Sequence, residues 1–290
     1  MSEADPHTRV RLDICYDGTD FSGWATQPDR RTVQQTVEDA LSTVLRVPVS
    51  LTVAGRTDSG VHATGQVAHA DVPSAVWADG SSQLVRRLAG VLPADVRVTA
   101  AREVSGEFDA RFAALWRRYV YLINDSESGV DPLTRAFVLG WPRRLDHDAM
   151  NDAAQRLVGL HDYIAFCRWR DGASTIRTVQ LFTVHRQDDL ITVTIRADAF
   201  CHSMVRSLVG ALVAVGEGRR DAEWPASMFT RTSRSDEVPV LPPHGLTLVE
   251  VAYPGDAELA ARQQQTRAKR SYSIVLSTAG GMKSLVAQGT

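Results

Sequence analysis

Alternating apolar and polar residues predict a series of strands in the first half of the chain. In residues 8–16, Val10, Leu12 and Ile14 share one face and charged residues share the other, as in a strand buried on one side. Similar patterns predict strands over 47–53, 65–72 and 96–104, and helices over 32–46 and 82–91. The predicted order of the first half is strand–helix–strand–strand–helix–strand.

The second half has a related predicted order. The pattern indicates a strand over 114–123, a helix over 146–158, a hairpin over 176–186 and 190–197, helices over 202–216 and 221–230, and a strand over 245–253. The expected fold class is α+β, with two similar halves whose antiparallel sheets are flanked by helices and a cleft between the halves. We expect a disordered lead over 1–7, an N-terminal half over 8–112, a C-terminal half over 113–253 and a mobile tail over 254–290.

One acidic residue stands out at a predicted junction between strands. Asp58 lies in Gly55–Ala63, which reads Gly-Arg-Thr-Asp-Ser-Gly-Val-His-Ala. Two glycines around an acid indicate unusual backbone angles or a close approach to a ligand. Asp58 is therefore either a turn-forming residue or a catalytic group presented at the end of a strand.

A single charge interrupts the apolar helix predicted over 202–216. Arg206 is the only charged residue from 203 to 216. A charge on so apolar a helix is costly unless it is paired, so Arg206 requires a carboxylate partner. The alternative is an arginine that extends its side chain to the surface.

The strand predicted over 114–123 has an unusually polar face. Arg117, Tyr119 and Tyr121 alternate on one side of it. This face either meets solvent with aromatic cross-strand pairs or lines a cleft. A loop rich in glycine and aromatic residues lies over 16–31, and it also has two interpretations. It either clamps an RNA strand or is a surface loop fixed by Trp24.

Bulk composition narrows the class of protein. The three cysteines have no paired spacing, the start of the chain is acidic and polar, and no apolar run is long enough to cross a bilayer. These features favour the cytoplasm, without a disulfide framework, a structural zinc or a membrane anchor. His62 and His69 lack a third ligand at suitable spacing, so we expect structural hydrogen bonds rather than a metal site.

Several blocks of sequence, in this order, resemble the tRNA pseudouridine synthase A family of the pseudouridine synthase superfamily. The matching blocks are Tyr16–Thr19 with Phe21 and Gly23–Trp24, Thr32–Gln34, Gly55–Ala63 with Gly65–Val67, Ala110–Phe112, Arg118–Tyr119 with Tyr121, Met204–Arg206 with Gly210, and Gly245–Leu246 with Leu248. The resemblance covers about residues 8–253. Two positions depart from the family pattern, with Ala25 where glutamine is usual and Asp109 where histidine is usual.

The resemblance implies an enzyme that isomerises uridine to pseudouridine at nucleotides 38, 39 and 40 of the tRNA anticodon arm. It implies that Asp58 is the catalytic residue, Tyr119 contacts the target base, Arg206 pairs with Asp58, and Arg56 helps the nucleotide to leave the stack. It also implies that no cofactor or catalytic metal is needed. The enzyme is expected to be a homodimer with the RNA lying across both subunits.

The chemistry of the reaction suits such residues. When the bond between N1 of uracil and C1′ of ribose breaks, the intermediate must be stabilised or captured, and a carboxylate can act there as a nucleophile or as a base. We expect Leu246 or Leu248 to form an apolar floor beneath the base and four arginines to contact the RNA backbone, namely Arg30, Arg31, Arg111 and Arg168. Two rival hypotheses are a glycosidase or nucleosidase, which would need a second acid, and a non-catalytic RNA-binding protein.

Overall fold

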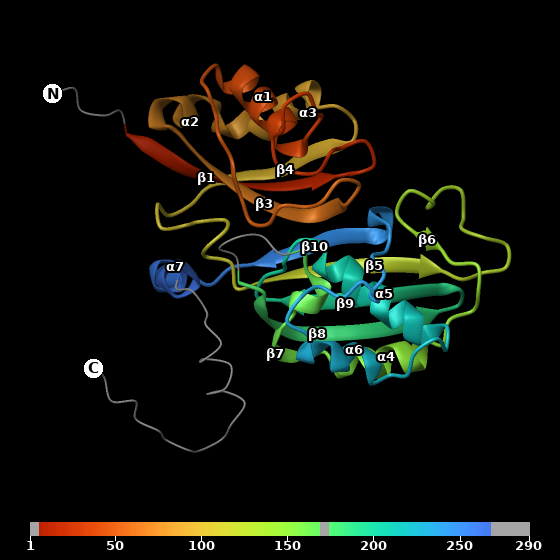
Figure 1. The fold of residues 1–290 in the computed structure, drawn as a ribbon. Coiled ribbons are helices and arrows are strands. Elements are labelled where there is room, and N and C mark those ends of the chain that lie inside the picture. Colours follow the sequence, from red (N-terminus) through yellow and green to blue (C-terminus); the bar gives the residue numbers. More distant parts are fainter. Residues whose placement is uncertain (1–5, 169–173, 268–290) are drawn as a thin grey trace, which may run out of the picture.

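The computed structural model describes residues 6–168 and 174–267, which form one sheet with helices packed against it (Figure 1). In this part of the chain the sheet has ten strands, and its main path runs β4-β1-β3-β10-β5-β9-β8-β7. The short strand β2 pairs with β3, and β6 pairs with β5. The α+β class predicted from the sequence is confirmed.

The N-terminal half supplies one side of this sheet. Its strands are β1 (His7–Tyr16), β2 (Thr52–Val53), β3 (His62–Pro73) and β4 (Val96–Glu103), and its helices are α1 (Val33–Leu45), α2 (Ser74–Gly80) and α3 (Leu84–Val91). Alternate residues of β1 are buried, and Val10 and Leu12 lie beside Leu41 of α1 and Leu84 of α3. The apolar face of the strand and the apolar faces of α1 and α3 therefore pack together in one core.

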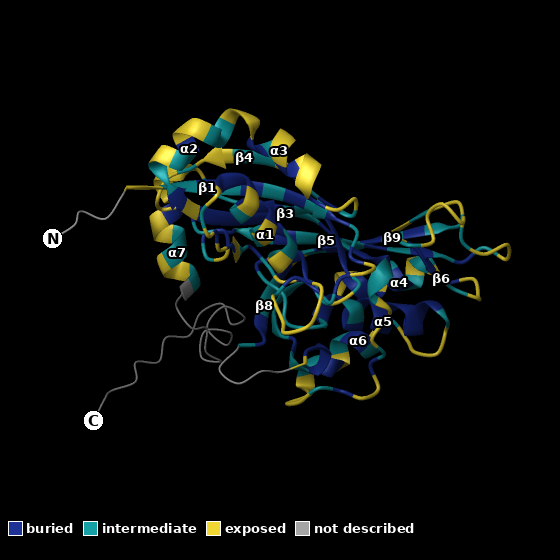
Figure 2. Cartoon of the chain, turned by 90° about the horizontal axis from the view of Figure 1, so that it is seen from above, coloured by how far each residue is buried: buried dark blue, intermediate teal, exposed yellow. Residues whose placement is uncertain are grey.

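The C-terminal half supplies the other side. Its strands are β5 (Trp116–Asn124), β6 (Leu139–Gly140), β7 (Gly159–Asp162), β8 (Ile176–Gln187), β9 (Leu190–Ala197) and β10 (Leu246–Ala252). Its helices are α4 (His147–Gln155), α5 (Met204–Gly216) and α6 (Trp224–Ser227), followed by α7 (Leu259–Arg267). Short 3₁₀ turns occupy Ser81–Gln83, Ile164–Phe166, Met228–Thr230, Pro243–Gly245 and Asp256–Glu258. Figure 2 shows buried and half-buried residues along the strands, while exposed residues gather on the outer sides of α2 and α3.

Strand β10 joins the two halves. It pairs with β3 in parallel, through Thr247 opposite His62 and Leu248 opposite Ala63, and with β5 in antiparallel. The two antiparallel sheets expected from the sequence are thus continuous, and the connection between them is parallel. A row of residues paired from strand to strand crosses the junction, from Tyr16 through Ala63 and Leu248 to Tyr119. Residues paired across neighbouring strands point to the same face of a sheet. Tyr16 of the N-terminal half and Tyr119 of the C-terminal half therefore lie on one face.

The structure differs from the sequence prediction over 47–53, where only Thr52–Val53 forms a strand. The amide of Val49 donates to Ser42 Oγ and the amide of Leu51 donates to Glu38 Oε1, at 3.1 and 2.7 Å. Side chains of α1 therefore satisfy amides that a longer strand would have paired.

The predicted mobile tail also differs at its start. Residues 256–267 form a 3₁₀ turn and α7, which the fading apolar pattern did not predict. Leu259 is buried, and the Arg262 guanidinium donates to the carbonyl of Ala114 at 3.1 Å. The remainder of the predicted tail, residues 268–290, lies outside the described residues, as do residues 1–5 of the predicted lead.

Candidate active site

The loop that carries Asp58 is held by a second loop over residues 21–24. The amide of Trp24 donates to the Thr57 carbonyl at 3.1 Å, and Ser59 Oγ donates to the Phe21 carbonyl at 3.1 Å. Gly23 has a φ of +93°, and a Cβ there would lie 2.9 Å from the Thr57 oxygen. Glycine is required at this position because the two backbones approach so closely.

Asp58 begins a tight turn. The amide of Val61 donates to the Asp58 carbonyl at 3.2 Å. Gly60 has a φ of +76°, and a Cβ there would lie 2.7 Å from Cγ of Pro243, next to β10. The turn is therefore fixed by its own hydrogen bond and by the C-terminal half of the chain.

Buried polar groups anchor the residues before Asp58. Tyr16 Oη and Thr57 Oγ1 share a hydrogen bond of 2.8 Å, and Gln66 Nε2 donates to the Gly55 carbonyl at 2.8 Å and to Tyr16 Oη at 3.2 Å. Burial raises the pKa of Tyr16 to about 12, against the opposing effect of its bonds to Thr57 and Gln66. Its hydroxyl stays protonated at neutral pH and serves as an anchor.

Asp58 faces two cationic or hydrogen-bonding side chains from the start of α5. Arg206 Nη2 donates to Asp58 Oδ2 at 3.0 Å. His202 Nε2 lies 3.3 Å from the other oxygen, Asp58 Oδ1. The Arg206 side chain is 16% exposed and that of Asp58 is 22% exposed, so the pair is sheltered but open to solvent on one side. The carboxylate partner that the sequence required for Arg206 is thus Asp58.

Further contacts fix the arginine. Arg206 Nη1 donates to the Leu241 carbonyl at 3.3 Å, and Nη2 also donates to Ser203 Oγ at 3.2 Å. Ser203 precedes α5 with a left-handed φ of 63°. The start of this helix and the segment before β10 together aim the guanidinium at Asp58.

His202 was not among the residues singled out from the sequence. The available signal was its position, four residues before Arg206 and immediately ahead of the apolar helix. Residues separated by four positions lie on the same side of a helix, and a residue just before the first turn can share that side.

Tyr119 lies in the row of residues that crosses the sheet. It is 7% exposed, and its ring meets that of Phe200 edge to face at a centroid distance of 5.1 Å. Burial raises the pKa of its hydroxyl well above the ordinary range, and the nearby Tyr16 and Asp58 raise it further. The hydroxyl is therefore neutral beside the Asp58 carboxylate. Leu248, its partner in β10, is fully buried, and Leu246 is opposite Tyr121.

Arg117 has a different position from that expected for a residue facing a cleft or solvent. It is 6% exposed and donates to the carbonyls of Ala54, Arg111 and Asp198 at 2.7 to 2.8 Å. Burial lowers the pKa of its guanidinium. Since Ala54 directly precedes Gly55, Arg117 ties the Asp58 loop to β5.

The arginines expected to contact RNA fall into two groups. Arg30, Arg56, Arg111 and Arg168 are exposed, and the backbone amide of Arg168 donates to the His202 carbonyl at 3.1 Å. Arg31 instead forms a bidentate pair with Asp95 at 2.7 and 2.8 Å and lies over the Phe21 ring. Its charge is already paired within the protein.

The histidines near the site make structural hydrogen bonds, as predicted. His62 Nδ1 accepts from the Gly18 amide at 2.9 Å and Nε2 donates to the His244 carbonyl at 3.1 Å. His69 Nδ1 accepts from the Ala110 amide at 3.0 Å, and burial lowers the pKa of its imidazole. Among residues 6–168 and 174–267, no cluster of three or more potential metal ligands is found. The same residues contain no helix with the length and apolarity needed to cross a bilayer.

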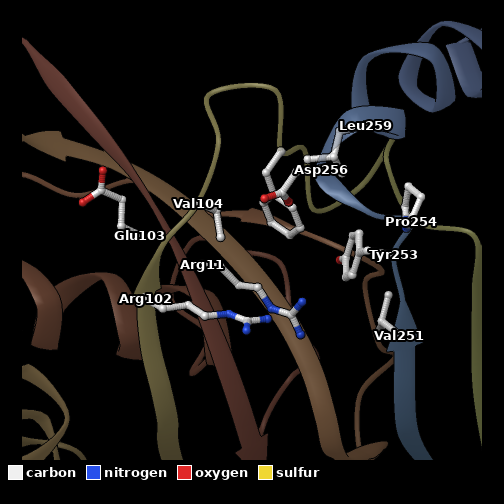
Figure 3. Close-up of a pocket in the computed structure, with 10 residues that line it drawn as sticks. Arg11, Arg102, Glu103, Val104, Val251, Tyr253, Pro254, Asp256 and Leu259 are labelled. Atoms are coloured by element: carbon white, nitrogen blue, oxygen red, sulfur yellow. The ribbon is translucent and has the colours of Figure 1, made fainter.

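A cavity of about 370 Å³ lies elsewhere, between β1, β4 and the start of α7 (Figure 3). Arg11 and Arg102 are opposite each other in the β1–β4 register and line it together with Glu103 and Asp256. Figure 3 shows the two guanidinium groups side by side. Because Asp13 pairs with Arg11 at 2.7 Å, acids balance the two arginines, and the cavity favours neither sign of ligand.

Comparison with known proteins gives one consistent family. The model of a family described as tRNA pseudouridine synthase matches residues 14–113 and 153–254. These ranges contain Asp58, His202 and Arg206, whereas Tyr119 lies between them.

Curated relatives match over nearly their full length. A protein of Streptomyces griseus is 57% identical over 274 residues, which cover 93% of this chain and 96% of the relative. Proteins of Frankia casuarinae and Mycobacterium leprae are 57% and 49% identical, over 92% and 91% of this chain and 97% and 96% of the relatives. All three are named tRNA pseudouridine synthase A.

Proposed function

The chain belongs to the tRNA pseudouridine synthase family, and we propose that it isomerises uridine to pseudouridine in tRNA with Asp58 as its catalytic carboxylate. The observation that supports this role best is the contact of 3.0 Å between Asp58 and Arg206. A guanidinium fixes the orientation of a neighbouring carboxylate. The carboxylate also remains 22% exposed, so a nucleotide can reach it.

The reaction breaks the N1–C1′ bond, turns the base and joins C5 to C1′. An ionised Asp58 serves either as the nucleophile that captures the intermediate or as the base that removes a ribose proton. Tyr119, whose hydroxyl is neutral, is proposed to contact the turned base near C5, where a proton must leave. Leu246 and Leu248, which pair with β5 beside it, are proposed to form the apolar floor.

We further propose the anticodon arm as the target, at nucleotides 38, 39 and 40. Paired uridines are hidden in a folded stem, so the target nucleotide must be flipped out. Arg56 is exposed two residues before Asp58, which suits it to the space left by the flipped nucleotide or to a phosphate. Arg30, Arg111 and Arg168 are proposed to contact the RNA backbone, and Arg31 to contribute less because Asp95 pairs with it.

A homodimer with the tRNA across both subunits is the proposed assembly, and sedimentation of the purified protein with and without tRNA tests it. A cytoplasmic location is proposed from the tRNA substrate and from three cysteines that are free in the structure.

Tritium release tests the catalytic role. A tRNA transcript made with C5-tritiated uridine loses tritium to water when pseudouridine forms. We expect wild type to release tritium and Asp58→Asn to release it at least about 10⁴-fold more slowly, because the amide is neither a base nor a nucleophile. Asp148→Asn is the matched control, since that side chain is 91% exposed on α4.

The outcomes separate the rival hypotheses. Unchanged release by Asp58→Asn would contradict the catalytic assignment. Free uracil in place of tritium would indicate a nucleosidase, and binding of tRNA with neither product would indicate an RNA-binding protein. Transcripts labelled at a single position, 38, 39, 40 or a distant uridine, test the target site.

A further inference from the structure

The two oxygens of the Asp58 carboxylate have different neighbours. Oδ2 accepts from Arg206 at 3.0 Å, and Oδ1 lies 3.3 Å from His202 Nε2. An Nε2–H group donates a hydrogen bond whether the imidazole is neutral or charged, provided that this nitrogen carries the proton. His202 thus complements Arg206 on the opposite side of the same carboxylate.

The backbone around His202 is fixed independently of its side chain. Its carbonyl accepts from the Arg168 amide at 3.1 Å, and the Met204 amide donates to the Cys201 carbonyl at 3.1 Å. Ser203 then takes a left-handed φ of 63° before α5 begins. This tight turn places the imidazole ahead of the helix, toward the Asp58 loop.

The two side chains beside the carboxylate differ in distance and in exposure. Arg206 has further contacts with Leu241 and Ser203, and its side chain is 16% exposed. His202 has a longer contact with the carboxylate, and its side chain is 26% exposed. The side chain beside Oδ2 is therefore the more buried of the two, and the side chain beside Oδ1 is the more exposed.

We propose that His202 is a positioning residue that fixes the plane of the Asp58 carboxylate through Oδ1. With Arg206 alone, a single hydrogen bond restrains the rotation of the carboxylate about its Cβ–Cγ bond. A second donor at Oδ1 restrains this rotation further and holds the carboxylate in place for the ribose and the base. This inference rests on the proposed function of Asp58.

Two substitutions separate the hydrogen bond from the volume of the ring. His202→Leu removes the donor, whereas His202→Gln keeps an N–H group at about the reach of Nε2. In single-turnover tritium release with saturating enzyme, we expect the leucine variant to be about 10- to 100-fold slower than wild type, because misplacement of a reacting group has effects of this size. We expect the glutamine variant to stay within about fivefold of wild type. The dissociation constant for tRNA should change less than about twofold in both.

Further variants keep the test decisive. His185→Leu, an exposed histidine of β8, is the matched control and should behave as wild type. If His202→Leu does not fold, His202→Asn replaces it, because asparagine carries the same amide as glutamine on a shorter side chain that cannot reach Oδ1. A merely structural role would impair leucine, asparagine and glutamine variants alike and would lower their thermal midpoints together.

Each result supports or overturns the inference. Slow release by His202→Leu with recovery in His202→Gln supports it. Wild-type rates in His202→Leu, or equal losses in both variants, would overturn it while leaving Asp58 as the catalytic residue if Asp58→Asn is inactive. A wild-type enzyme that releases no tritium would overturn the proposed function, and this inference with it.

Discussion

Arg206 and Arg186 each pair with an aspartate, yet the two sites are built differently. Asp125 has a fully buried side chain that receives two bonds from Arg186, at 2.7 and 2.8 Å. It also accepts from the Leu145 amide at 2.8 Å and from Arg144 at 3.2 Å. Asp58, by contrast, is 22% exposed and meets Arg206 through one bond.

The difference lies in how much acceptor capacity each aspartate keeps. Four donors occupy the acceptor sites of Asp125, so its oxygens have little capacity for another partner. Asp58 has Arg206 and His202 as its neighbours, and it keeps acceptor capacity and access to solvent. The proposed catalytic carboxylate is therefore oriented by few donors, whereas the carboxylate that joins loops has its acceptor sites filled.

The largest expected effect is on stability, at the pair of Asp125 and Arg186, which we call the saturated pair. Asp125→Asn should lower the free energy of unfolding by about 3 kcal/mol, because it leaves the half-buried Arg186 without its counter-charge. Urea denaturation measures this loss, and tritium release per folded molecule should stay close to wild type. Asp58→Asn is the comparison, with an expected change below about 1 kcal/mol. Equal losses in the two variants would remove the distinction between the pairs.

The next largest effect is on the rate of tritium release, at the pair of Asp58 and Arg206, which is open to solvent. Arg206→Lys should slow single-turnover tritium release about 100-fold, or about 2.7 kcal/mol, since one ammonium cannot bind both Asp58 and the Leu241 carbonyl as the guanidinium does. Arg186→Lys should instead lower stability and leave the rate of the folded enzyme unchanged. A rate for Arg206→Lys within threefold of wild type would show that the simultaneous contacts of the guanidinium with Asp58 and Leu241 are not needed for the reaction.

Acid should weaken the saturated pair by a smaller amount. Burial acts to raise the pKa of Asp125, but the bonds from Arg186 and the Leu145 amide and the charge of Arg144 outweigh it, so the pKa lies below the ordinary value. A depressed pKa contributes stability above the unfolded value of about 4, and this contribution is lost as pH falls toward the folded pKa. Unfolding free energies measured from pH 6 to 3 should therefore converge for wild type and Asp125→Asn. A constant difference across that range would contradict this assignment.

The smallest effect concerns a third arginine pair, on the surface. Because Asp95 already neutralises Arg31, Arg31→Gln should change tRNA affinity less than Arg30→Gln does. If Arg30 contacts one phosphate, its removal should reduce the slope of log affinity against log salt by about 0.7 to 0.9. Titrations at several salt concentrations measure both slopes, and an equal reduction in the two variants would show that tRNA displaces Asp95 from Arg31.

Part of this arrangement could be predicted from the sequence. The alternation in β1 and β5 and the apolar stripe of α5 predicted those elements, and the single charge of that stripe indicated that Arg206 needs an acid. The resemblance to the family, and not the charge pattern, named Asp58 as that acid, and the two side chains are in contact at 3.0 Å. The catalytic use of Asp58 remains a prediction.

Other features depend on contacts that no local pattern carries. Strand β7 has only four residues, and α2 buries only Trp77, so neither gives a strong periodic signal. Arg117 can be buried because its guanidinium donates hydrogen bonds to three carbonyls, two of them from distant segments. His202 was missed because, unlike Arg206, it lies outside the apolar stripe, where a polar residue calls for no partner, although its contact is with the same Asp58.

The place of β10 in the sheet also constrains how the protein is made. Residues 246–252 are the only link in the described sheet between β3 and β5, which lie far earlier in the sequence. While the chain emerges from the ribosome, the N-terminal and C-terminal strands can each fold, but their shared edge stays unpaired until this segment appears. The Asp58 loop and Tyr119 thus come into register only after residues 246–252 have been made. A protein built this way completes its candidate site only when β10 joins the sheet.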